Sequence, residues 1–145
     1  MNGKRIALVV SLVAFGLVFG LTGCASPSVY QMQSGDRTAG AEGEMTVTTD
    51  DNGNQVVALT VAHLPRPSQL DEQMAIYTVW ISPADSGQYY NVGRLRLADD
   101  RTGSLTFTTP LSAYDMLVTA EAQPTEMTPS DQVVLRREMT RSRNR

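Results

Sequence analysis

Residues 75–82 read AIYTVWIS, an unbroken run of β-branched, aromatic and other mostly apolar side chains. Successive side chains of a strand point to opposite faces of its sheet, so this run places apolar groups on both faces. Such a pattern favours a strand in the middle of a sheet rather than at its edge. We therefore predict a central strand here, with Trp80 buried between two sheets.

Six further segments have the same character and are separated by turn residues such as Gly, Pro, Asn and Asp. The first two are joined by Asp50-Asp51-Asn52-Gly53-Asn54, in which Asn-Gly can adopt the positive φ angles of a hairpin turn. Seven short strands without an amphipathic helix predict an all-β domain, specifically an antiparallel seven-stranded immunoglobulin-like β-sandwich. The six segments are 44–49, 55–64, 90–97, the stretch around Leu105 and Phe107, 114–123 and 132–139.

The first 23 residues have the organisation of a bacterial signal peptide: a short positive segment at 2–5, an apolar run at 6–19 and small residues before Cys24. Leu21-Thr22-Gly23-Cys24 resembles the lipobox of bacterial lipoproteins. The resemblance implies that the signal peptidase recognises Leu21, Thr22 and Gly23, and that Cys24 carries the lipid that holds the protein in a membrane. An uncleaved membrane-spanning helix over 6–23 is the alternative.

Removal of the leader leaves 145 − 23 = 122 residues, enough for one domain. The two basic leader residues leave with it, so 12 − 2 = 10 basic residues face 15 acidic ones and the net charge becomes −5. This charge argues against nucleic acid as a partner. Residues 24–43 are rich in Ser, Gly and Ala and predict a flexible tether, 44–139 the β-sandwich domain, and 140–145 a basic tail that is either solvated or in contact with an anionic lipid or polymer.

Two aromatic residues occupy the places that a β-sandwich of the immunoglobulin type gives to its core tryptophan and to its tyrosine corner. Trp80 lies in the third predicted strand and Tyr114 begins the sixth. A tyrosine in that corner buries its ring and bonds its hydroxyl to backbone a few residues upstream, here within 109–113.

Five runs in the predicted strands and the loops beside them have a shared likeness to one known domain. They are Tyr77-x-x-Trp80, Asn91-Val92-Gly93-Arg94-Leu95, Gly103-Ser104-Leu105, Val118-Thr119-Ala120-Glu121 through Pro129, and Val133-Val134-Leu135. These runs resemble the extracytoplasmic C-terminal domain of anti-sigma-K factors. The resemblance covers about residues 75–135 and implies a β-sandwich and a sensory role in envelope signalling. Inhibition of a sigma factor is not implied, since Cys24 would place the chain on the far side of the membrane.

The sequence offers few groups for catalysis or metal binding. His63 is the one histidine and Cys24 the one cysteine, which argues against thiol catalysis, a Ser-His-Asp triad and the usual zinc sites. Asp50, Asn52 and Asn54 alternate as calcium ligands do, but Gly53 and Val61 stand where an EF-hand loop needs other residues. We expect no cofactor and no metal.

Three further candidates have competing interpretations. Glu121 is the first acid to test for a chemical role, against a solvent-facing position on its strand. Asp50/Asp51 and Asp99/Asp100 fit turns, where aspartate bonds local backbone. Tyr89 and Tyr90, with Trp80, could form a platform for sugar or peptide, against ordinary strand packing.

From the residues, the expected function is that of a non-catalytic envelope lipoprotein. It would sit in the outer membrane where the cell has one, otherwise on the outer face of the cytoplasmic membrane, and bind an envelope protein or polymer. A sensory accessory and, less favoured, an enzyme are the alternatives.

Overall fold

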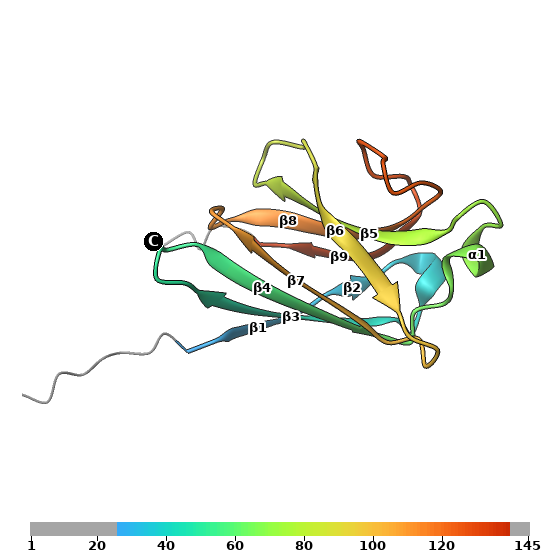
Figure 1. The fold of residues 1–145 in the computed structure, drawn as a ribbon, viewed down its shortest axis with the longest axis horizontal. Coiled ribbons are helices and arrows are strands. Elements are labelled where there is room, and N and C mark those ends of the chain that lie inside the picture. The colour runs from blue at the N-terminus through green and yellow to red at the C-terminus, as the bar shows by residue number, and fades with distance from the viewer. Residues whose placement is uncertain (1–25, 140–145) are drawn as a thin grey trace, which may run out of the picture.

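In a computed structural model, which describes residues 26–139, the chain forms a nearly closed antiparallel sheet (Figure 1). Nine strands occur in this part of the chain, in the spatial order β1-β3-β4-β7-β6-β5-β8-β9-β2. The all-β antiparallel prediction is confirmed, but the described strands number nine rather than seven. The elements are β1 (Ser28–Gln31), β2 (Gln33–Ser34), the 3-10 turn η1 (Asp36–Thr38), β3 (Glu42–Thr49), β4 (Gln55–Ala62), α1 (Pro67–Leu70), β5 (Ile76–Pro83), β6 (Tyr90–Leu97), β7 (Gly103–Thr109), β8 (Tyr114–Glu121) and β9 (Val133–Glu138).

The sheet is folded into two layers that share one strand. β1, β3, β4 and β7 form one layer, and β5, β8, β9 and β2 form the other. β6 crosses diagonally between them, as Figure 1 shows: its residues 90–95 pair with β5, whereas Arg96 and Leu97 pair with β7. Strand order is therefore continuous around the molecule.

The core fills the space between the layers. On β8 the alternate residues Tyr114, Met116, Val118 and Ala120 are all fully buried and belong to it, as their two-residue spacing predicts. β5 contributes alternate residues from Tyr77 to Ile81 to the same core and lies between β6 and β8, which confirms that it is a central strand. Each large apolar side chain buried in this way contributes about 1.5–3 kcal/mol.

The prediction of a flexible tether is wrong for the described part of 24–43. β1 pairs with β3, and β2 pairs with β9, so this short segment joins the outer strands of the two layers. Met32, between β1 and β2, is buried and its N–H donates to the Gly43 carbonyl at 2.7 Å. The sequence analysis missed these strands because backbone pairing and one buried side chain hold them, not a run of apolar residues.

Arg137 of β9 also fixes this segment. Its guanidinium donates to the Gln31 carbonyl at 3.1 Å and lies 5.3 Å from the centre of the Tyr30 ring, a cation–π distance. Arg137 therefore serves the fold.

The β3–β4 and β6–β7 turns have the aspartates that the sequence predicts. Asp50 accepts hydrogen bonds from the N–H groups of Asn52 and Asn54, both at 2.9 Å, and the second of these is the main cause that lowers the pKa of Asp50. Gly53 has a φ of 81°, whereas Asn52 does not have a positive φ, so one residue rather than two takes the left-handed conformation. In the β6–β7 turn, Asp100 accepts from Thr102 in the same way.

The predicted leader 1–23 with Leu21, Thr22 and Gly23, the predicted lipidation site Cys24 and the predicted basic tail 140–145 lie outside the described residues. Within residues 26–139 the longest helix is a single turn, and none is long and apolar enough to cross a membrane.

Candidate binding groove

A groove opens where β6 leaves β5. The two strands pair as far as Tyr77 and Leu95, after which β6 turns to β7 and β5 stays with β8. The segment from Arg66 through α1 closes the far side, leaving a volume of about 600 Å³, within the size range of small-molecule sites. The residues that line it are Arg66, Pro67, Ser68, Met74, Ala75, Ile76, Tyr77, Arg94, Leu95, Arg96, Leu97, Ala98 and Asp99.

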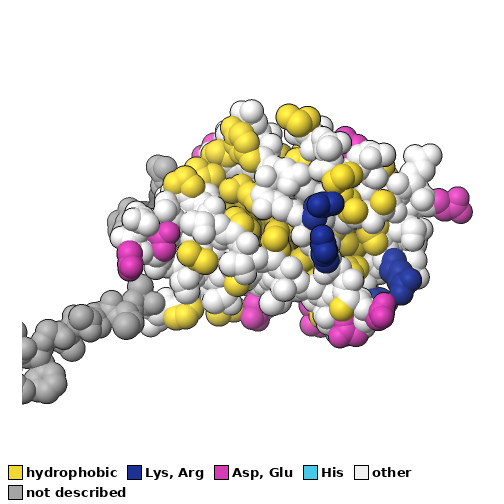
Figure 2. All heavy atoms as spheres, viewed as in Figure 1, with side chains coloured by type: hydrophobic (Ala, Val, Ile, Leu, Met, Phe, Trp, Pro, Cys, Tyr) yellow, Lys and Arg dark blue, Asp and Glu magenta, His cyan; other side chains and the backbone are white. Residues whose placement is uncertain are grey.

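Arginines dominate the charge of this groove. Arg94 and Arg96 are exposed on either side of the buried Leu95, so both project from the outer face of β6. Arg66 approaches from the opposite wall, and its guanidinium lies 3.7 Å from the carboxylate of Asp99. Figure 2 shows basic side chains gathered over β6 and beside α1. Among the described lining residues, three arginines thus face one aspartate, on a chain whose net charge is negative.

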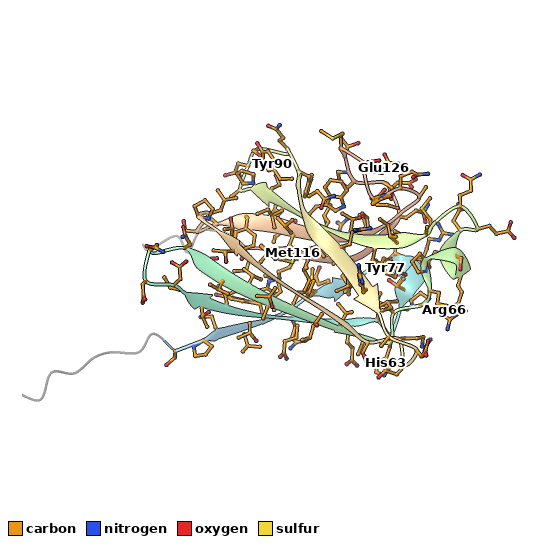
Figure 3. The ribbon with its side chains drawn as sticks, in the orientation of Figure 1. His63, Arg66, Tyr77, Tyr90, Met116 and Glu126 are labelled. Atoms are coloured by element: carbon orange, nitrogen blue, oxygen red, sulfur yellow. The ribbon has the colours of Figure 1, made fainter. Side chains whose placement is uncertain are left out.

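Side-chain hydrogen bonds hold the walls in place. The ring of Tyr77 lies in the core and its hydroxyl donates to the Pro65 carbonyl at 2.9 Å, which ties the segment before α1 to β5. Burial raises the pKa of Tyr77. The backbone N–H of Arg66 donates to the Gln69 side chain at 2.8 Å across the first turn of α1. Figure 3 shows Tyr77 and Arg66 near the same end of the molecule.

A second hollow of about 730 Å³ adjoins the groove and shares Arg96 and Ala98 with it. Its charged lining differs, because Glu42 and Glu44 of β3 contribute carboxylates there. The adjoining hollow therefore has a mixed charge, since Arg96 lines it together with Glu42 and Glu44.

Trp80 is fully buried, but not between the layers as the sequence analysis expected. Its neighbours Val79 and Ile81 belong to the core, whereas Trp80 points to the other face of β5. Its indole N–H donates to the Thr119 hydroxyl at 2.8 Å. The expectation failed because alternation fixes which residues share a face but not which face is the core.

The buried Glu121 belongs to the same group of side chains as Trp80 and Thr119. It is 3% exposed, so the solvent-facing interpretation is wrong. Its carboxylate accepts a hydrogen bond from the Thr119 hydroxyl and one from the Ser130 N–H at 2.8 Å, while the Ser130 hydroxyl donates to the Ala120 carbonyl at 2.7 Å. These bonds fasten the β8–β9 connection over the outer face of β5 and β8 (Figure 1), which is why Glu121 is buried. The role is structural.

Tyr114 departs from the tyrosine corner in one respect. Its ring is fully buried in the core, as expected. The hydroxyl, however, is buried without a hydrogen-bond partner in the described structure, so the predicted bond to 109–113 is absent there. Burial, with a smaller contribution from Tyr30, raises the pKa of Tyr114 to about 12.

The remaining candidates are not brought together. Trp80 is inaccessible while Tyr90 is 49% exposed, so the aromatic platform does not form. His63 is exposed at the end of β4, with its ring 3.9 Å from the Glu42 carboxylate. Within residues 26–139 no group of three His, Cys, Asp or Glu side chains is placed to hold a metal ion.

Comparison with protein-family models, with curated proteins and with solved structures found no match to this chain. The residues and shape of the groove are therefore the basis for inferring a function. Sequence reasoning missed its arginines, although the alternation Arg94-Leu95-Arg96 on a predicted strand was a usable signal: two like charges on one face with an apolar residue inward.

Proposed function

We propose that this protein is a lipid-anchored, non-catalytic binding module of the bacterial envelope, and that its groove binds an anionic ligand. The anchor is Cys24, as the lipobox resemblance implies. The observation that carries the binding role is the groove of about 600 Å³ with Arg66, Arg94 and Arg96 on its lining.

Arginine suits this role for a chemical reason. Its planar guanidinium is always charged and presents paired donors that match carboxylate, sulfate or phosphate oxygens. Charges separated by more than about 8–10 Å are screened at physiological ionic strength. An anion in the cavity is therefore attracted by the three nearby guanidiniums more strongly than it is repelled by the more distant acidic residues of the chain.

The same site offers little for chemistry on a bound ligand. Asp99 is the carboxylate of the described lining, and it is exposed and paired with Arg66. A catalytic role for a carboxylate usually requires a perturbed environment or a second acid or base within reach. Binding without turnover is therefore the function we propose.

A binding titration tests the proposal. The probe is a sulfated disaccharide, with its unsulfated counterpart as the neutral comparison. Hydrogen bonds to charged groups contribute roughly 1.5–3 kcal/mol, so the double variant Arg94→Gln/Arg96→Gln should bind the sulfated probe about tenfold to a hundredfold more weakly. Arg136→Gln, on an exposed arginine of β9 outside the groove, is the control, and its loss is compared with that of Arg94→Gln alone, which also removes one charge.

Equal affinity for the sulfated and unsulfated probes would refute the proposal. So would equal losses in Arg94→Gln and in Arg136→Gln, because the charge effect would then be general and not due to the groove.

A further inference from the structure

The spacing of the two arginines on β6 carries information about the shape of the ligand. Arg94 and Arg96 are alternate residues of one strand, so their Cα atoms lie about 6.8 Å apart. Alternate residues of any extended peptide have the same repeat. A peptide lying along β6 can therefore present two carboxylates in register with the two guanidiniums.

The apolar part of the lining favours a peptide over a uniformly charged polymer. Met74, Ile76 and Leu97 are half-buried around the cavity and offer apolar surface beside the arginines. An extended peptide supplies apolar and acidic side chains on alternate faces. A long polyanion that continued past Arg96 would instead meet Glu42 and Glu44 in the adjoining hollow.

The place where the chain enters the sheet argues against a lipid headgroup of the anchoring membrane. Ser28, at the start of β1, pairs with Val47, near the end of β3 remote from Glu42. Figure 1 shows β1 and α1 at opposite ends of the molecule, and residues of α1 line the groove. On the lipoprotein proposal, three residues lie between Cys24 and Ser28, and the four Cα–Cα steps span at most about 14 Å. The domain is then held close to its membrane, with the groove at the end away from it.

We infer that the groove takes an extended acidic segment of a protein partner, with carboxylates at alternate positions facing Arg94 and Arg96. This inference rests on the proposed anion-binding function and adds the class of the ligand and its spacing. Arg66 contacts the same segment from the opposite wall, and the apolar side chains between the acids, which point away from Arg94 and Arg96, contact Met74.

Two synthetic peptides of equal length, composition and charge test the inference. Both peptides contain two glutamates, and their other residues are leucine and serine. The glutamates occupy positions i and i+2 in the first peptide and positions i and i+3 in the second. The full chain, purified in detergent, should bind the first peptide at least tenfold more tightly. Arg94→Gln/Arg96→Gln should abolish this preference, and Arg136→Gln should preserve it.

Several outcomes overturn the inference. Equal affinity for both peptides would do so while leaving the anion site intact, provided that the sulfated disaccharide still binds in an arginine-dependent way. Stronger arginine-dependent retention on phosphatidylglycerol vesicles than on the peptide would assign the groove to lipid instead. Failure of every anionic probe would overturn the proposed function as well.

Discussion

Replacement of Glu121 by alanine should cost far more stability than a surface acid normally contributes. The carboxylate accepts hydrogen bonds from Thr119 and from the Ser130 backbone in a buried setting. A buried donor left without its partner costs roughly 1–3 kcal/mol, so the loss of the acceptor for both donors predicts about 2–6 kcal/mol. Typical domains have only about 5–15 kcal/mol in total, so the variant should be marginally folded.

Urea unfolding measures this loss, and Trp80 fluorescence provides a local reporter because it is the sole tryptophan and bonds to Thr119. With a slope of about 1–3 kcal/mol per molar urea, the midpoint should fall by about 1 M or more. Glu126→Ala, on an exposed acid of the same connection, is the control and should unfold with the wild type. If Glu121→Ala also unfolded with the wild type, the structural role that we assign to this buried carboxylate would be refuted.

Three further predictions concern Tyr114 and Cys24. Tyr114→Phe should be at least as stable as the wild type by thermal unfolding, because it removes a buried hydroxyl that has no partner. Tyr114→Ala should lose about 3–5 kcal/mol because it leaves a cavity. A clear loss of stability in the phenylalanine variant would contradict this. The ultraviolet difference titration between wild type and Tyr114→Phe should show a phenolate with a pKa near 12 instead of 10. Since the unfolded chain releases that proton first, the stability from Tyr114 is complete below pH 10 and is lost between pH 10 and 12; a midpoint at pH 10 would show that the ring is exposed. Cys24→Ser should abolish labelling by a fatty-acid probe and leave the precursor uncleaved, and continued labelling with normal processing would refute the lipoprotein proposal.

Alternation along the chain was enough to find the seven longer strands. β6 has the predicted bounds, and the residues of β8 that face the core are the alternate ones that its two-residue period predicts. Local turn chemistry was equally readable, since Asp50 and Asp100 bond their own turns as expected. These features depend on neighbours in sequence.

The features that could not be predicted depend on contacts between distant residues. Trp80 is buried because Ser130 and Glu121 hold a loop over the outer face of the sheet. The burial of a side chain therefore does not show that it lies between the two layers. The first strands form because residues near Met32 meet β3 and β9, more than a hundred residues away in the case of β9. The groove depends on the exchange of partners by β6, which no local pattern encodes.

The central claim is that the arginine groove is the binding surface, and chemical-shift mapping of the isotope-labelled chain tests it most directly. Addition of the sulfated disaccharide should shift the backbone signals of Ser68 and of residues 94–97, which line the groove. The signals of Thr106 and Thr108, exposed on β7 outside it, should stay in place. Shifts spread evenly over both sets, or confined to β7, would contradict the account.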